Sequence, residues 1–170
     1  PGAGDKPFIL RHQVSSDTDS LAESISSTPI HAGADGPESA IEALYQGLTG
    51  AGYDQNCDGV YDETTDVPPL TATSTDLFSG TASALSDSSV FEGPLGGFGF
   101  STHALPILVY ATDNYLRDPE AGYGTPGGCP LDAGSSHVIA AAESIGARLV
   151  GISTSSWIPT TQMETLAEST

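Results

Sequence analysis

Leu105-Pro-Ile-Leu-Val-Tyr-Ala-Thr112 is the strongest structural signal in the sequence. This continuous apolar run contains β-branched residues, and such a run is typical of a strand buried in a parallel sheet. Residues 148–153 (RLVGIS) have the same character, and residues 135–145 between the two runs predict an alanine-rich helix that ends at Gly146. A strand, a helix and another strand in this order predict an α/β domain with a mainly parallel sheet.

Two further helices are predicted from residue spacing and capping. Residues 38–48 (ESAIEALYQGL) carry one apolar stripe made of Ile41, Leu44, Tyr45 and Leu48. Pro37 suits the first turn of that helix. Residues 160–168 predict the last helix of the chain, with a threonine cap at its start.

The remaining segments are less regular. Residues 7–14 (PFILRHQV) predict a strand. Residues 15–17 then cap a predicted helix that carries Leu21 and Ile25 on one face. Residues 67–104 lack a persistent period and predict a long irregular insertion, and loops of this length are often functional.

The charge balance excludes some partners and favours others. The chain has 22 acidic and 4 basic residues, which gives a formal net charge of −18. Nucleic acid binding needs clustered cations, so we do not expect a nucleic acid partner. An acidic surface suits divalent cations, a saline medium or simple solubility. No apolar run reaches the roughly 18 residues of a membrane-spanning helix, so membrane insertion is not expected.

Two cysteines, Cys57 and Cys129, lie in polar segments rich in glycine and proline. Cysteines in such loops favour a disulfide bond and an oxidising, extracellular compartment, although two free thiols remain an alternative. The bridge would close a loop of about 70 residues and would contribute about 4 kcal/mol in the chain-entropy model.

Residues 54–66 (DQNCDGVYDETTD) have the pattern of a calcium-binding loop. Oxygen-bearing side chains occupy relative positions 1, 3, 5 and 9, a glycine occupies position 6, and a backbone carbonyl is available at position 7. The predicted ligands at these positions are Asp54, Asn56, Asp58, Val60 and Asp62. The pattern agrees with an EF-hand loop over its first nine positions.

The pattern then departs from an EF-hand. Position 12 is Thr65, where an EF-hand has a bidentate glutamate, so Asp66 or Glu63 is the expected closing ligand. The flanking sequence does not predict paired helices, which indicates an EF-hand-like loop inserted in another fold. An extracellular module of this type binds calcium at roughly 10⁻⁴ to 10⁻³ M. The alternative is an Asx-rich turn that binds no ion.

Two other acidic points lie where α/β sheets place ligands, just past the ends of strands. Asp113 follows the strand of residues 105–112, and Asp35 and Glu38 precede the helix that starts near residue 38. The alternative is that Asp113 caps a helix or a turn and that Glu38, an acid in the first turn of its helix, interacts favourably with the helix dipole.

Three stretches resemble von Willebrand factor A domains. Residues 34–44 (ADGPESAIEAL) resemble the second metal loop of that family, in the form that integrin β subunits have. Residues 108–113 (LVYATD) resemble its fourth strand and third metal loop, with Asn114 where the family usually has glycine. Residues 145–152 (IGARLVGI) are similar to its next helix end and strand.

The resemblance covers most of residues 7–170, with residues 53–66 and 67–104 as insertions. It implies that residues 1–170 form a single doubly wound domain with helices on both faces of the sheet. It also implies a metal-ion-dependent adhesion site at one edge of that sheet. An acidic group of a protein partner would complete the ligand shell of the metal there.

The resemblance also assigns residues to that adhesion site. It implies that Glu38 and Asp113 are ligands of the adhesion metal, which could be magnesium. It implies a neighbouring calcium site made by Asp35 and the carbonyl of Pro37. The family's first motif, Asp-x-Ser-x-Ser, is absent, and Asp17-Thr-Asp-Ser20 is the nearest stretch. The chain is therefore expected to lack the family's first strand and helix.

These features lead to one expected function and one alternative. We expect a calcium-stabilised adhesion or protein-interaction module, secreted or displayed by a bacterium or a similar cell. The alternative is a structural subunit of an extracellular assembly or filament, bound to other copies of itself, in which calcium supplies only rigidity. No enzyme is expected, because the histidines show no ligand spacing and no nucleophile motif is present: His12, His31, His103 and His137.

Overall fold

The computed structural model describes residues 6–28, 36–60, 62, 64, 66, 67, 69, 95–123, 133–155 and 160–170. Within these residues the chain is a mixed α/β protein with four α-helices, one short 3₁₀ helix and a two-stranded sheet. The elements in chain order are α1 (Thr18–Ser26), α2 (Ala40–Thr49), β1 (Ile107–Thr112), η2 (Pro119–Ala121), α3 (Ser135–Ile145), β2 (Arg148–Ser153) and α4 (Thr160–Glu168). The α/β class is therefore confirmed, and the doubly wound arrangement remains a prediction.

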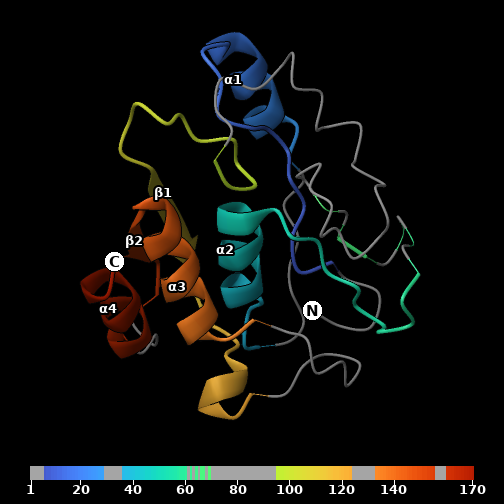
Figure 1. The fold of residues 1–170 in the computed structure, drawn as a ribbon, viewed down its shortest axis with the longest axis vertical. Coiled ribbons are helices and arrows are strands. Elements are labelled where there is room, and N and C mark those ends of the chain that lie inside the picture. Colours follow the sequence, from blue (N-terminus) through green and yellow to red (C-terminus); the bar gives the residue numbers. More distant parts are fainter. Residues whose placement is uncertain are drawn as a thin grey trace.

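Strands β1 and β2 run parallel and α3 connects them. Their register pairs Ile107 with Arg148 at one end and Thr112 with Ser153 at the other. A parallel pair needs such a crossover connection, because a tight turn cannot return the chain to the same end of the sheet. Figure 1 shows α2, α3 and α4 in front of the strands, with α1 at the top, apart from these three helices.

The helices cover one face of the sheet and form the core with it. Leu108 of β1 and Leu149 of β2 point into a cluster that includes residues from α2, α3 and α4. The fully buried helix residues of this cluster are Ile41, Leu48, Val138, Ala142 and Leu166. The predicted apolar stripe of α2 is thus confirmed as its core-facing side.

The opposite face of the sheet differs from the sequence prediction. Ile107, Val109, Val150 and Ile152 are exposed, so the strands are not buried on both faces. The burial pattern of both strands instead begins with an exposed, a buried and an exposed residue, as in a sheet covered on one side. An apolar run marks a strand, but it does not show whether a second layer covers it.

Residues 7–14 do not form the strand that their apolar pattern predicts. In the structure these residues contact a tight turn formed by residues 95–100, and they do not pair with a neighbouring strand. The Val14 N–H donates to the Phe98 carbonyl at 2.9 Å, and the Phe8 and Phe98 rings lie 5.9 Å apart. The turn offers too few backbone partners for a strand ladder, and the Gln13 side chain adds a hydrogen bond to the Gly97 carbonyl at 3.1 Å.

The turn of residues 95–100 belongs to the predicted irregular insertion and packs on α2. Leu95 and Phe100 pair across it, and Gly96 adopts a φ of 67° that other residues rarely adopt. The Phe98 ring lies against Gly47, where an added Cβ would lie 2.4 Å from the ring. Glycine at position 47 therefore allows this close contact.

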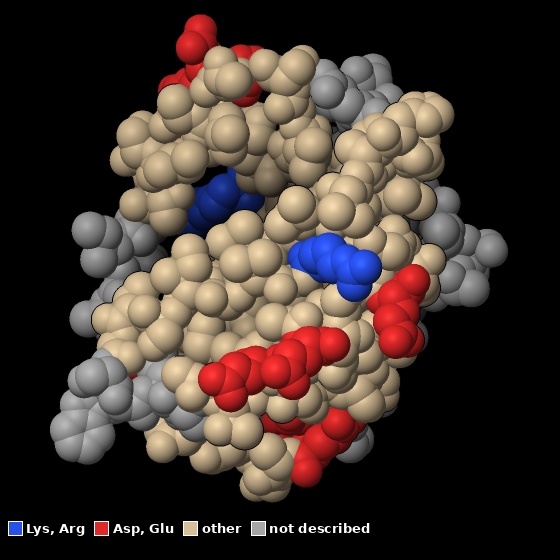
Figure 2. All heavy atoms as spheres, turned by 90° about the vertical axis from the view of Figure 1, so that its left-hand side faces the viewer, with Lys and Arg blue, Asp and Glu red and all other residues tan. Residues whose placement is uncertain are grey.

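No helix in the described ranges is long and apolar enough to cross a membrane. On the face shown in Figure 2, acidic and basic side chains are sparse and are separated by uncharged surface. The acidic excess of the chain therefore does not form a continuous patch on this face.

Candidate functional site

A short antiparallel pair closes the predicted calcium loop at its base. The N–H of Tyr53 donates to the carbonyl of Val67 and the N–H of Val67 donates to that of Tyr53, each at 2.9 Å. At the tip, Cys57 and Gly59 adopt positive φ angles of 57° and 76°. The glycine at position 6 of the pattern thus provides the sharp turn that the sequence predicts.

Two buried carboxylates organise the inside of this loop. Asp54 accepts a hydrogen bond from the Gly59 N–H at 2.7 Å, across the turn. Asp66 accepts from the N–H groups of Gln55, at 3.1 Å, and Asp62, at 2.7 Å. The first and last acids of the pattern therefore bind the loop backbone, and both are buried.

The other predicted ligands lie on the exposed side of the loop. Asp58 accepts from the Val60 N–H at 2.7 Å and from the Asn56 side chain at 2.9 Å. Asp62 accepts from the side chain and the N–H of Thr64, at 2.7 and 2.8 Å, and these two hydrogen bonds lower its pKa below the ordinary value. Local hydrogen bonds of this Asx type fix each oxygen in place.

The loop contains oxygen atoms that could bind a hard cation, although these oxygens do not converge on one point. Carboxylate, amide and carbonyl oxygens are the ligands that calcium prefers. The side-chain oxygen of Gln55 is buried and has no hydrogen-bond partner. In the described part of the chain, however, there is no group of three or more His, Cys, Asp or Glu side chains that could hold a metal ion. Glu63 lies outside the described residues, and calcium binding remains a prediction.

Cys57, at the tip of this loop, is disulfide-bonded. No free cysteine is present among the described residues. Cys129 lies outside them, so the pairing of Cys57 with Cys129 stays a prediction.

The second predicted site lies where the N-terminus of α2 meets the segment after β1. The Glu38 N–H donates to the Tyr115 carbonyl, and the Arg117 N–H donates to the Glu38 carbonyl, each at 2.7 Å. Gly36 packs so closely on Asn114 that an added Cβ would lie 2.4 Å from its amide nitrogen. The structure thus brings the segments that contain Glu38 and Asp113 side by side.

The side chains at this edge differ in environment. Asp113 is exposed and directly follows β1, whereas Glu38 is half-buried. The buried Arg117 side chain donates to the Pro37 carbonyl at 3.1 Å, the oxygen to which the resemblance assigns calcium. A fixed positive charge at that oxygen disfavours a cation beside it. Asp35 lies outside the described residues.

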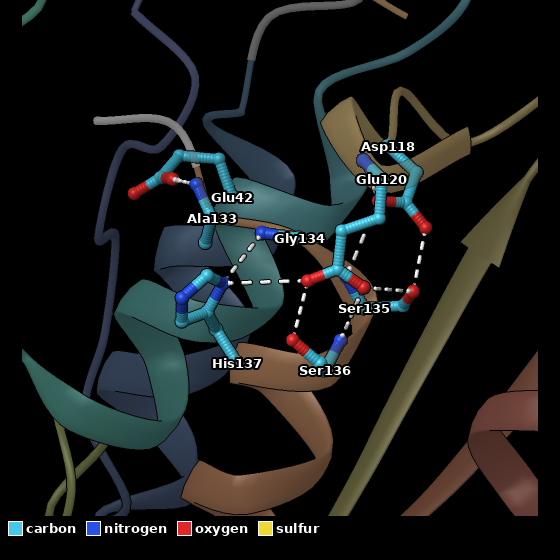
Figure 3. A network of polar contacts seen from close by, with 8 residues as sticks. All are labelled: Glu42, Asp118, Glu120, Ala133, Gly134, Ser135, Ser136 and His137. Atoms are coloured by element: carbon cyan, nitrogen blue, oxygen red, sulfur yellow. Dashed lines mark hydrogen bonds and ion pairs between the residues drawn. The ribbon is translucent and has the colours of Figure 1, made fainter. Parts of the chain in front are cut away.

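A polar network at the N-terminus of α3 was not predicted from the sequence (Figure 3). Asp118 accepts from the Ser135 hydroxyl at 2.6 Å, and its other oxygen caps η2 through the Glu120 N–H at 3.0 Å. Glu120 accepts from the N–H of Ser136 at 3.1 Å and from its hydroxyl. Both carboxylates interact favourably with the positive end of the α3 dipole.

The same network continues into the core through α2. Buried Glu42 accepts from the Ala133 N–H and from the Gln46 side chain, each at 2.7 Å. Gln46 in turn accepts from the Gly52 N–H and donates to the Gly52 carbonyl, at 2.8 and 2.9 Å. These bonds join α2 to the start of α3 and to the residues that lead into the calcium-type loop.

The contacts of this network join η2, α2 and the start of α3. The Nδ1 atom of His137 accepts from the Gly134 N–H at 3.1 Å and lies 3.7 Å from Glu120 (Figure 3). The Ser136 hydroxyl bonds to Glu120 and not to His137, so it lacks the histidine base of a nucleophilic serine. Hydrogen bonds from Ser136 are the main reason that the pKa of Glu120 lies below its ordinary value. Ser135 and Ser136 are the first two residues of α3, and the sequence did not show that carboxylates from another segment would bind them.

Comparisons with protein families, curated proteins and solved structures found no match.

Proposed function

We propose that the chain is a calcium-stabilised, extracellular protein-interaction module of the von Willebrand factor A kind. The observation that carries this proposal is the backbone contact between the start of α2 and the segment after β1. Glu38 exchanges hydrogen bonds with Tyr115 and Arg117, two and four residues beyond Asp113. Two acids far apart in the sequence therefore belong to neighbouring segments at one end of the sheet.

The chemistry of this edge suits a metal-dependent contact. Glu38 and Asp113 supply hard oxygen donors of the kind that magnesium and calcium prefer. A bound ion would supply a positive charge that an acidic group of a protein partner can approach. The partner proposed for this edge is therefore a protein that presents a carboxylate. Binding, and no catalysis, is the proposed role.

The loop of residues 54–66 has a supporting role in this proposal. Its two buried carboxylates already bind the backbone, and a calcium ion at the exposed oxygens would hold the tip in one conformation. The disulfide bond at Cys57 supports an oxidising compartment outside the cytosol. Calcium loops of extracellular modules have dissociation constants of about 10⁻⁴ to 10⁻³ M.

The alternative is a structural subunit in which calcium supplies only rigidity. The position of Arg117 favours it, because this side chain donates to the Pro37 carbonyl at the proposed metal edge. In that case the guanidinium group takes the place of the neighbouring ion, and the edge has no adhesion metal.

Titration calorimetry on the EDTA-treated chain tests the proposal. We expect a calcium site, and a second site that magnesium also fills. Glu38→Gln and Asp113→Asn, which keep the shape of each side chain, should each abolish the magnesium response. Asp19→Asn, at an exposed acid of α1, is the matched control and should leave both sites unchanged. Absence of any magnesium response would contradict the adhesion role and favour the alternative.

A further inference from the structure

The tip of the loop of residues 54–66 contains the dipeptide Asp58–Gly59. An aspartyl side chain can react with the main-chain nitrogen that follows it, and glycine leaves this nitrogen unhindered because it has no side chain. Both residues are exposed, and among the described residues nothing lies within 4 Å of a Cβ added at Gly59. No described side chain therefore shields this dipeptide from water.

Isoaspartate forms from such a dipeptide in two steps. In the first, the Gly59 nitrogen attacks Cγ of the protonated Asp58 carboxyl group. The bond between nitrogen and Cγ forms, and the carboxyl OH leaves as water with the hydrogen of the N–H. In the second, water adds to the main-chain carbonyl carbon of Asp58, and the bond from this carbon to the nitrogen breaks. The main chain then runs through Cβ and Cγ, and the mass of the chain is unchanged.

Hydrogen bonds hold both reacting groups of this dipeptide. The Gly59 N–H donates to the buried Asp54 carboxylate at 2.7 Å. The two oxygens of Asp58 accept from the Val60 N–H at 2.7 Å and from the Asn56 side chain at 2.9 Å. Ring closure breaks the bond to Asp54, because the N–H hydrogen is lost. It also breaks at least one bond to Asp58, because one carboxyl oxygen leaves.

We propose that Asp58 is a site of spontaneous isoaspartate formation, and that the hydrogen bonds to Asp54 and Asp58 slow this reaction in the folded chain. Ring closure needs the nitrogen and the carboxyl carbon in a reactive orientation, which forms when the tip opens locally. Isomerisation is far slower than such opening, so its rate follows the fraction of chains in which the tip is open.

Isomerisation changes the loop at position 5 of the calcium pattern. The main chain gains one carbon atom at residue 58, and the carboxylate moves from Cγ to a carbon bonded directly to Cα. The hydrogen bond from the Val60 N–H to the Asp58 side chain is then lost. We expect the isomerised loop to lose its calcium site. This consequence rests on the proposed function, whereas the isomerisation itself does not.

Peptide mapping of the aged chain tests the site. The EDTA-treated chain is kept for several weeks in mildly acidic buffer, once folded and once unfolded in urea. An endoproteinase that cleaves before aspartate and not before isoaspartate then releases the peptides for mass spectrometry. We expect isoaspartate at position 58 in the unfolded chain, and at least about tenfold slower formation in the folded chain. No isoaspartate at position 58 in urea, or equal rates in the two samples, would overturn the proposal.

Substitutions in the loop test which hydrogen bonds slow the reaction. Asp54→Ala removes the acceptor of the Gly59 N–H and should raise the rate in the folded chain by at least about threefold. Asn56→Ala, at an exposed residue, removes a donor to Asp58 and should also raise it. Asp62→Ala is the matched control, because this acid of the same loop does not bond to the dipeptide. It should leave the rate unchanged.

Circular dichroism should show that these variants are folded, and Asn56→Ala alone decides the point if Asp54→Ala does not fold. Rates that neither substitution raises above that of Asp62→Ala overturn the role of the hydrogen bonds.

Calcium binding separates this inference from the proposed function. The isomerised chain is purified away from the fresh chain, and equilibrium dialysis measures the calcium bound by each. We expect the isomerised chain to bind one calcium ion fewer. Equal binding by two chains that both bind calcium would overturn the effect on the loop. A fresh chain that binds no calcium would contradict the proposed function, and the isoaspartate rates would still test the site at Asp58.

Discussion

At the scale of single residues, buried carboxylates that accept backbone N–H bonds hold the loop of residues 54–66 in shape. Asp66 is the clearest case, because it is fully buried and bridges Gln55 and Asp62. The sequence identified Asp66 as a candidate ligand from its position in the pattern. It did not show that these oxygens already bind the backbone, since that depends on how the loop closes through Tyr53 and Val67.

Asp66→Asn should destabilise the protein even without calcium. The amide group would turn an NH₂ donor toward a backbone N–H donor, and one buried hydrogen bond would be lost. We expect the free energy of unfolding to fall by about 1–3 kcal/mol, measured by urea denaturation in EDTA. Asp58→Asn, at an exposed acid of the same loop, should change it by less than about 0.5 kcal/mol. Equal effects of the two substitutions would contradict the structural role of Asp66.

Glu120 gives a prediction about pH. Ser136 hydrogen bonds lower the pKa of Glu120 in the folded chain, so its carboxylate favours folding. That stabilisation is present above the unfolded-state pKa of glutamate and is lost as the pH falls through the lower folded-state pKa. An NMR titration of the Glu120 carboxyl carbon should show the lowered pKa.

The Ser136→Ala substitution should raise the pKa of Glu120 toward the ordinary glutamate value. Ser144→Ala, at the other end of α3, is the matched control and should leave it unchanged. If Ser136→Ala has no effect on the titration, the hydrogen bonds at the start of α3 do not set this pKa.

At the scale of elements, the spacing of apolar residues predicted the positions of individual helices and strands. Helices α2, α3 and α4 and strands β1 and β2 lie where apolar spacing and glycine stops place them. Residues 7–14 failed as a strand because their neighbour is a turn, which no local pattern reveals. The network of Asp118 and Glu120 with α3 was missed for the same reason, since it joins segments 15 or more residues apart.

The contact between α2 and the turn of residues 95–100 can be tested at Gly47. Alanine is a better helix former than glycine by about 1 kcal/mol. An added Cβ would nevertheless lie 2.4 Å from the Phe98 ring, so Gly47→Ala should lower the free energy of unfolding by about 1–3 kcal/mol. Denaturant unfolding of the single variants and the double variant would measure both effects.

The sign of the effect should reverse when the ring is absent. In a Phe98→Ala background, Gly47→Ala should be neutral or stabilising by up to about 1 kcal/mol, because only the helix propensity then remains. A destabilisation of equal size in both backgrounds would show that Phe98 does not limit position 47.

At the scale of the whole molecule, the sequence predicted the α/β class but not the one-sided sheet. Ile107 and Val109 are apolar residues in a strand, and only the arrangement of the helices shows that their face is uncovered. The two acidic segments at Glu38 and Asp113 were predicted to meet at the end of the sheet, and their backbones do lie together.

Equilibrium dialysis with radioactive calcium tests whether the loop of residues 54–66 binds calcium. The EDTA-treated chain is dialysed against about 10 mM calcium, well above the expected dissociation constant of roughly 10⁻⁴ to 10⁻³ M. We expect at least one calcium ion per chain, and one fewer in Asp58→Ala, whose side chain is exposed. A chain that binds no calcium, or one that binds the same number after Asp58→Ala, would contradict a calcium site in the loop of residues 54–66.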